Sequence, residues 1–151
     1  MGRKRSRSWK YIYFCVASLI SLFLAGCVIS ENIKKIQEYK EASEHLLRAK
    51  ELLAQGDYEG SLKENQKVLS LGDNKLPADE ALFNIGLIYS HYGYQKKDYK
   101  KSLTFYKRLV RDFPMSPLVE QAKIWIGVLE VIEKTKQVDI EIEEKKKKLS
   151  R

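Results

Sequence analysis

The chain has 151 residues, of which 44% are hydrophobic and 32% are charged, and its formal net charge is +8. This length fits one modest domain. Five basic residues and no acidic residue lie within residues 1–10. Without this segment the 28 basic residues fall to 23 against 20 acidic ones, and a net charge of about +3 gives no reason to expect a nucleic-acid-binding protein.

The amino terminus has the three parts of a secretory signal peptide. The basic segment is followed by an almost wholly apolar stretch, residues 11–23, and then by the sequence LAGC, residues 24–27. A basic start, an apolar middle and small residues before the cut are typical of such a signal and predict the removal of residues 1–26. The alternative is an uncleaved membrane anchor, because residues 11–29 are nearly long enough to span a bilayer.

Residues 24–27 resemble the lipobox of bacterial lipoproteins. The resemblance implies that Cys27 becomes the first residue of the mature protein, with a diacylglycerol on its sulfur and an acyl group on its amino group. Three acyl chains exceed the two membrane signals that stable anchoring requires. Val28 follows the cysteine in place of aspartate. In the enterobacterial lipoproteins that this chain resembles, this implies transport to the outer membrane, with the protein facing the periplasm.

The lipid also accounts for the cysteines. Cys15 leaves with the signal peptide and Cys27 is acylated, so no thiol remains for a disulfide, a zinc site or a nucleophile. No cofactor is expected beyond the covalent lipid.

The mature chain begins with a helical pattern. Residues 30–55 contain neither proline nor glycine and carry apolar residues at mostly helical spacing, with Ser30 as a suitable N-cap. Gly56 and Asp57 end this helix. A second apolar stripe then predicts another helix from residue 58 to Gly72.

The clearest helical pattern lies in residues 82–114, where two apolar stripes predict two amphipathic helices. Gly86 lies within the first stripe, where a missing side chain lets a neighbouring helix approach closely, and Ser102 lies within the second. With Tyr99 and the closing Pro114, these positions resemble a tetratricopeptide repeat, a helix pair of roughly 34 residues.

Other parts of the chain match this repeat less closely. Residues 42–72 follow it more weakly than the second helix pair does. The turn between the two helices of residues 82–114 is about four residues longer than the repeat requires, near residues 93–96. It is expected to bulge at one rim of the repeat. Ile126-Gly127 corresponds to Ile85-Gly86 and predicts the first helix of a third repeat, whose partner helix is missing.

A charged tail follows, in which apolar spacing alternates between three and four residues. This spacing predicts a weak heptad pattern, at Val128, Val131, Thr135, Val138, Ile142, Lys145 and Leu149. The lysines at 145–148 are interpreted either as a solvated helix end or as a basic patch for anionic partners.

The predicted fold is therefore all-α: a short tetratricopeptide-repeat solenoid of about two and a half helix pairs with a C-terminal helical tail. The expected divisions are the lipoprotein signal peptide, residues 1–26, the tetratricopeptide-like helical domain, residues 27–133, and the charged heptad-like tail, residues 134–151.

No catalytic motif or metal-ligand spacing occurs in the sequence. The two histidines, His45 and His91, lie 46 positions apart without cysteine or acidic ligands at metal-binding spacing, and are expected to be solvated or hydrogen-bonded within the fold. We therefore predict no catalytic residues, no metal and no enzyme activity.

The resemblance instead implies a concave groove, lined by the first helix of each repeat, that binds a protein partner. The inward positions that map onto this chain are Leu46, Lys50, Phe83, Leu87, His91, Ile124 and Val128. Their apolar side chains indicate either an open interaction site or a surface covered by the protein's own tail.

Residues 113–127, FPMSPLVEQAKIWIG, are similar in spacing to BamD-like lipoproteins of outer-membrane assembly, although such chains have about twice as many repeats. The function expected from this likeness is a lipid-anchored periplasmic scaffold for envelope or outer-membrane protein assembly. Two alternatives are an accessory lipoprotein of an envelope sensor kinase and a structural lipoprotein that self-associates through its tail.

Overall fold

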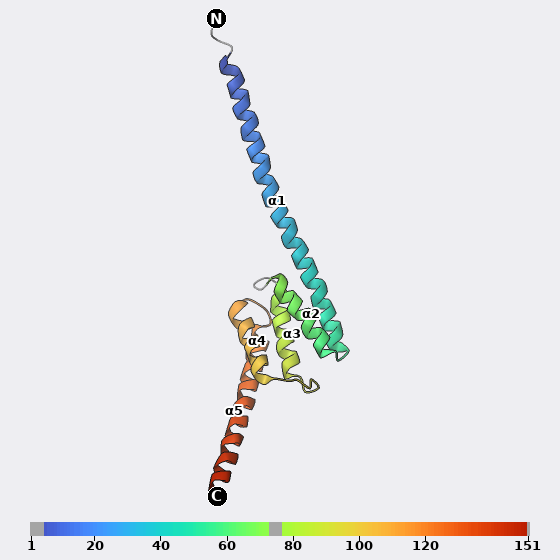
Figure 1. The fold of residues 1–151 in the computed structure, drawn as a ribbon, viewed down its shortest axis with the longest axis vertical. Helices are drawn as coiled ribbons and strands as arrows, with labels where there is room; N and C mark the ends of the chain where they lie inside the picture. The colour runs from blue at the N-terminus through green and yellow to red at the C-terminus, as the bar shows by residue number, and fades with distance from the viewer. Residues whose placement is uncertain (1–4, 73–76, 151) are drawn as a thin grey trace. The chain divides into compact units, whose positions relative to one another are not determined.

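The protein is all-helical over the residues that its computed structural model describes, 5–72 and 77–150, and no strand occurs among them. Within residues 5–32 only the side chains of Tyr13, Phe14 and Val16 are described. The helices are α1 (Arg5–Ala54), α2 (Tyr58–Leu71), α3 (Ala78–Ser90), α4 (Tyr99–Asp112) and α5 (Val119–Leu149), as Figure 1 shows. The all-α prediction is confirmed. Over the described ranges, no helix combines the length and the apolar character that crossing a membrane requires.

Contacts divide the chain into two units, residues 1–38 and residues 39–151, with the boundary inside α1. The first unit contains the amino-terminal part of α1, in which Lys34 and Glu38 form an ion pair of 3.8 Å one helical turn apart. The predicted helix start at Ser30 is wrong, because α1 begins at Arg5 and continues through that position. The apolar segment before it is itself helical, so no new N-cap is needed. The backbone of Cys27 lies in α1, but its side chain is outside the described ones.

The second unit contains two helical hairpins built in the same way. The second helix of each begins after an aspartate that caps it: the Asp57 carboxylate accepts a hydrogen bond from the Gly60 amide at 2.9 Å, and the Asp98 carboxylate accepts one from the Lys101 amide at 3.0 Å. In the first hairpin, Gly56 adopts a φ of 80°, which favours glycine, and so ends α1 where the sequence predicted.

The helices of each hairpin cross at a small residue. The Ser61 hydroxyl of α2 donates to the carbonyl of Ala49 in α1 at 2.7 Å, and the Ser102 hydroxyl of α4 donates to the carbonyl of Gly86 in α3 at 2.6 Å. All four residues are buried. Serine is therefore small enough for the crossing, and it also connects the two helices by a hydrogen bond.

Gly86 permits the closest packing in the second hairpin. A Cβ atom at this position would lie 2.8 Å from Cε1 and 2.9 Å from Cζ of Tyr106, whose ring is fully buried. The ring therefore occupies the space that a side chain at residue 86 would need.

The core runs through the second unit from α1 to α5. Successive helices pack against one another, and α5 packs on α4 through its first three turns (Figure 1). Nearly all the buried apolar side chains belong to one cluster, which includes Ala42, Leu62, Val68, Leu82, Ile85, Ile88, Tyr106, Leu109, Ala122 and Leu129. This continuous core explains why two hairpins and one extra helix can form a stable unit.

A polar residue replaces the tyrosine at the corresponding place in the first hairpin. Asn65 is fully buried, donates through its side-chain amide to the Ser61 carbonyl at 2.9 Å and accepts from the Asn84 amide at 3.3 Å. Its hydrogen bonds offset the cost of burying the amide. The weaker match of this hairpin to the apolar pattern therefore reflects a polar contact between α2 and α3.

We predict that Gly86→Ala lowers the free energy of unfolding by about 1–3 kcal/mol, because the new methyl group overlaps the Tyr106 ring. Gly127→Ala is the matched control, since a Cβ there meets nothing within 4 Å and should leave stability unchanged or raise it by up to about 1 kcal/mol through helix propensity. Urea unfolding followed by circular dichroism measures both. Equal effects of the two substitutions would contradict this account of the crossing.

Candidate functional site

The residues predicted to line the groove do not share one environment. Phe83 and Leu87 are half-buried on α3, whereas Ile124 and Val128 on α5 are 68% and 46% exposed. Leu46 instead lies in the core with 5% exposure, because it follows Ala42 by one helical turn on the buried face of α1. It is therefore not available at the surface for a partner.

Lys50 is exposed and its amine forms an ion pair with the Glu80 carboxylate, which joins α1 to α3. Both side chains are nearly half exposed, so the pair adds little to stability. Its charges are available at the surface beside the half-buried apolar residues of α3.

Phe83 belongs to a series of aromatic contacts that crosses three helices. Its ring meets Tyr106 of α4 edge-on at a centroid distance of 5.4 Å, and Tyr106 stacks on Trp125 of α5 at 6.3 Å with an interplanar angle of 7°. Burial raises the pKa of the Tyr106 hydroxyl above its ordinary value. Phe83 therefore contributes to the packing of the domain as well as to its surface.

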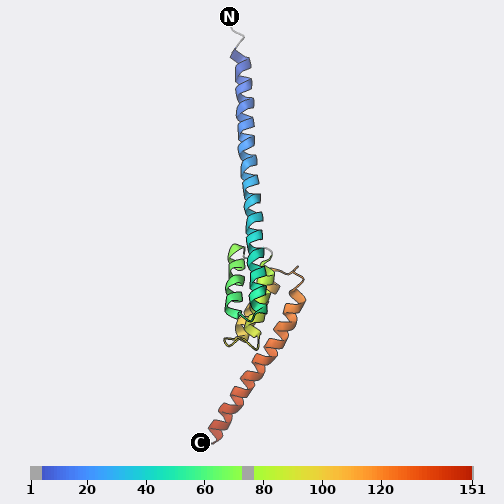
Figure 2. The same ribbon diagram turned by 90° about the vertical axis from the view of Figure 1, so that its right-hand side faces the viewer.

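The tail does not cover this surface. Residues 134–150 are exposed at every position, and α5 continues as one helix past the last turn that packs on α4 (Figure 2). Lys107 of α4 pairs with Glu130 of α5 at 2.6 Å near the end of that contact. The sequence left two interpretations of the apolar groove positions, an open interaction site or a surface covered by the tail. In the described chain the tail does not cover them.

His91 lies at the α3–α4 turn. Its Nδ1 atom is 2.9 Å from the Tyr58 hydroxyl and accepts a hydrogen bond from the Gly93 amide at 3.1 Å. The other histidine, His45, hydrogen-bonds the Glu64 carboxylate at 2.6 Å between α1 and α2. Both side chains are thus hydrogen-bonded within the fold, as predicted. No group of three metal-binding side chains occurs in the described ranges.

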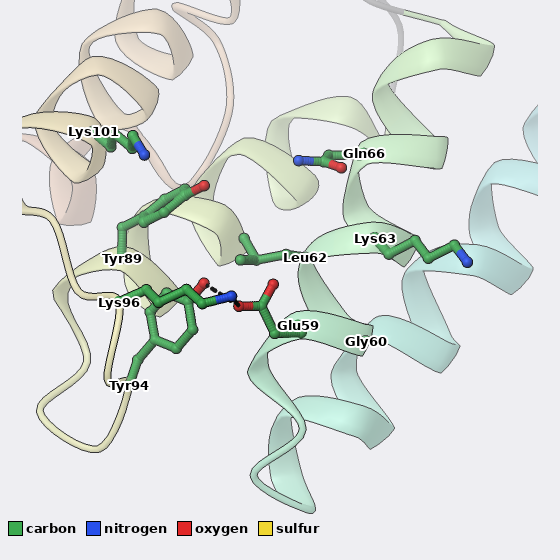
Figure 3. A pocket seen from close by; sticks show the side chains of 9 residues that line it. All are labelled: Glu59, Gly60, Leu62, Lys63, Gln66, Tyr89, Tyr94, Lys96 and Lys101. Carbon is green, nitrogen blue, oxygen red and sulfur yellow. Dashed lines mark hydrogen bonds and ion pairs between the residues drawn. The ribbon is translucent and has the colours of Figure 1, made fainter.

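The long α3–α4 turn packs against α2, whereas the sequence predicted that it would bulge at the rim. Tyr94 is buried, and its hydroxyl donates to the Glu59 carboxylate at 2.9 Å. The Lys96 amine reaches the same carboxylate at 2.7 Å, as Figure 3 shows. The extra residues therefore join the second hairpin to the first. The tyrosine within the insertion was the available sequence signal for this contact.

These contacts shift the ionisation of three side chains. The pKa of Glu59 is lowered, mainly by its hydrogen bond with Lys96 and then by that with Tyr94. The same contact raises the pKa of Lys96. Burial, and then the hydrogen bond to Glu59, raises the pKa of Tyr94 to about 12. Near neutral pH all three groups are therefore in the protonation states that hold the turn on α2.

An open pocket of about 520 Å³ lies beside this turn, between α2 and the start of α4 (Figure 3). Besides Lys63, its charged side chains contact neighbours: Lys96 pairs with Glu59, and Lys101 lies over the Tyr89 ring at 5.3 Å and pairs with Asp98 at 3.8 Å. We interpret Glu59, Lys96 and Lys101 as structural, because each is paired with an oppositely charged neighbour.

No protein-family model matches the chain, and no curated protein or solved structure matches it either. The features that bear on function are therefore the chain's own sequence motifs and the surface of α3 and α5.

We predict that Glu59→Gln loosens the α3–α4 turn and accelerates tryptic cleavage after Lys96 and Lys97 several-fold, because the substitution removes the ion pair with Lys96. Glu44→Gln, at an exposed position of α1, is the matched control and should leave the cleavage rate unchanged. Mass spectrometry of the digest locates each cut.

The contact of Glu59 with the α3–α4 turn should weaken at low pH. Because the pKa of Glu59 is lowered below its ordinary value of 4.5, its contribution is present above that pH and is lost as the pH falls through the lowered value. The protection factors of the Tyr94 and Lys97 amides, which remove the intrinsic effect of pH on exchange, should therefore fall in acid for the wild type and change less for Glu59→Gln. Identical acid responses would contradict the assignment to Glu59.

Proposed function

We propose that this protein is a lipid-anchored tetratricopeptide-repeat scaffold that binds protein partners at the periplasmic side of the outer membrane. The observation that carries the proposal is the repetition of one hairpin, in which Asp57 and Asp98 cap the second helix and Ser61 and Ser102 bind a small residue of the first. Stacked helical hairpins of this kind offer extended surfaces for protein recognition.

The surface of α3 and α5 fits a partner helix or an extended peptide with an apolar face. Phe83 and Leu87 supply partly buried apolar contacts, Ile124 and Val128 supply exposed ones, and the Lys50–Glu80 pair supplies charges beside them. Apolar anchors flanked by charged groups are typical of grooves that bind amphipathic helices. A partner there would cover apolar area that is otherwise in contact with water.

The role in envelope or outer-membrane protein assembly is supported by the start of α5. The similarity to BamD-like lipoproteins lies in residues 113–127, and in this chain the same segment is fixed to α3: the Ser116 hydroxyl donates to the Asp79 carboxylate at 2.6 Å, and Val119 and Ala122 are buried. The segment therefore holds the start of α5 against α3, which supports the interpretation of α5 as the first helix of a third repeat.

Membrane fractionation of the wild type and Cys27→Ser tests the lipid anchor. We expect the wild type in the outer membrane, and we expect Cys27→Ser to be absent from it, because the substituted chain has no sulfur to acylate. Mass spectrometry of the mature amino terminus should find the lipid on Cys27. Retention of both forms in the inner membrane would indicate an uncleaved anchor and reject the outer-membrane location.

Leu87→Lys tests the groove. Leu87 is half-buried, and the amine of a lysine can reach water while its methylene groups retain part of the packing, so the melting temperature should fall only slightly. We expect cross-linking to the groove's partner in membranes to fall about tenfold or more, because a charge would be desolvated in the interface.

Met115→Lys is the control for this experiment. It introduces the same side chain at a residue 94% exposed in the α4–α5 connection, outside the predicted groove. Cross-linking should remain at the wild-type level. Equal loss in both variants, or no loss in either, would reject the groove as the binding surface.

A further inference from the structure

The carboxyl-terminal half of α5 has an apolar face that the second unit leaves exposed. Beyond Glu130 no residue of the helix up to Ser150 is buried. The exposed apolar side chains on this face have 44% to 88% of their surface accessible and comprise Val128, Val131, Val138, Ile142 and Leu149. A stripe of this length on a single projecting helix is unusual without a partner helix.

The spacing of this stripe defines a heptad. Intervals of three and four residues place Val128, Ile142 and Leu149 at a positions and Val131 and Val138 at d positions. The remaining a position is occupied by Thr135, and the remaining d position is occupied by Lys145. The structure adds that the whole stripe lies on one uninterrupted helix, Val119–Leu149. The seam therefore has the geometry that a second helix needs for knobs-into-holes packing.

The charges beside the seam identify the partner. Lys134, Glu141 and Lys148 occupy g positions, and Asp139 and Lys146 occupy e positions. In two parallel helices in register, a g residue faces the e residue of the following heptad in the other helix. Lys134 then faces Asp139 of the second copy, and Glu141 faces Lys146 of the second copy. Each pair is attractive and occurs twice by symmetry.

Antiparallel helices use these charges less well, because g faces g and e faces e. Two antiparallel registers give the longest overlap. The first brings Glu141 against Glu141 of the second copy, and Asp139 against Asp139 of the second copy. The second register pairs Lys134 with Glu141 but sets Asp139 beside the uncharged Ile132. Only the parallel register gives an attractive partner to every charged e and g side chain except Lys148, which has no e residue opposite it within residues 128–149.

We propose that the protein forms a homodimer through a parallel, in-register, two-stranded coiled coil of residues 128–149. The proposal does not rest on the groove: Val128 belongs to both surfaces, and the charged pairs that favour the dimer lie beyond it. Thr135 and Lys145 weaken the seam, because polar groups at core positions stabilise a coiled coil less than apolar ones. Attachment of both copies to one membrane raises their local concentration and favours the association.

The test uses the full-length lipidated protein in detergent, with sedimentation equilibrium measuring the dimer dissociation constant. Lys134→Glu should weaken the dimer about tenfold or more, because it converts two attractive pairs into repulsive ones. Lys136→Glu makes the same charge change at the b position of the following heptad, on the outer side of the helix, and should have no more than about a twofold effect.

Charge-swap variants decide the orientation. Lys134→Glu with Asp139→Lys restores the pairs of a parallel dimer and should recover wild-type affinity. Lys134→Glu with Glu141→Lys restores the pair of an antiparallel dimer and, in a parallel one, sets like charges together, so it should weaken association further. Recovery by the second combination and not by the first would overturn the parallel arrangement.

Lys145→Leu tests the seam itself. The substitution replaces a charged d residue by an apolar one and should tighten the dimer about tenfold or more if residue 145 lies in the seam. A wild-type protein that remains monomeric at all concentrations, together with a monomeric Lys145→Leu, would overturn self-association. That result would leave the partner of the groove, measured by cross-linking at Leu87, unaffected.

Discussion

The ring of Tyr106 against the bare backbone of Gly86 is the contact on which the arrangement of α3, α4 and α5 depends. It brings α3 and α4 close enough for the Ser102 hydroxyl to bind the Gly86 carbonyl. The same ring also contacts Phe83 edge-on and stacks on Trp125. One buried tyrosine therefore positions the second hairpin, the start of the following helix and the apolar surface between them. The proposed groove depends on this packing although Tyr106 itself is buried.

The two helices of the first hairpin also cross closely, but different side chains pack at their crossing. Its crossing uses Ala49 and Ser61, and the place of the tyrosine is taken by Asn65, whose amide binds both its own helix and Asn84 of α3. An apolar ring and a hydrogen-bonded amide thus occupy equivalent places in successive hairpins. The hydrogen bond between Asn65 and Asn84 also connects the two hairpins. The α3–α4 turn adds a further connection through Glu59.

Most of the helical architecture follows from the sequence because its signals are local. Gly56 and the capping aspartates act within a few residues, and the apolar stripes record which face of each helix is buried. Contacts between distant segments were not predictable in this way. The docking of Tyr94 on Glu59 joins residues 35 positions apart, and the burial of Leu46 depends on how α1 is rotated against its neighbours. The continuation of α1 through Ser30 reflects the helical character of the apolar segment before it.

The uninterrupted course of α5 gives the molecule a stiff connection between two surfaces. Its 31 residues correspond to roughly 46 Å of helix, beginning in the core at Val119 and ending in the exposed tail. No proline lies within it to act as a hinge. In the proposed dimer, each copy would therefore hold its groove at a set spacing from the other. A ligand with two suitably separated recognition segments would gain avidity, whereas one with a single segment would not.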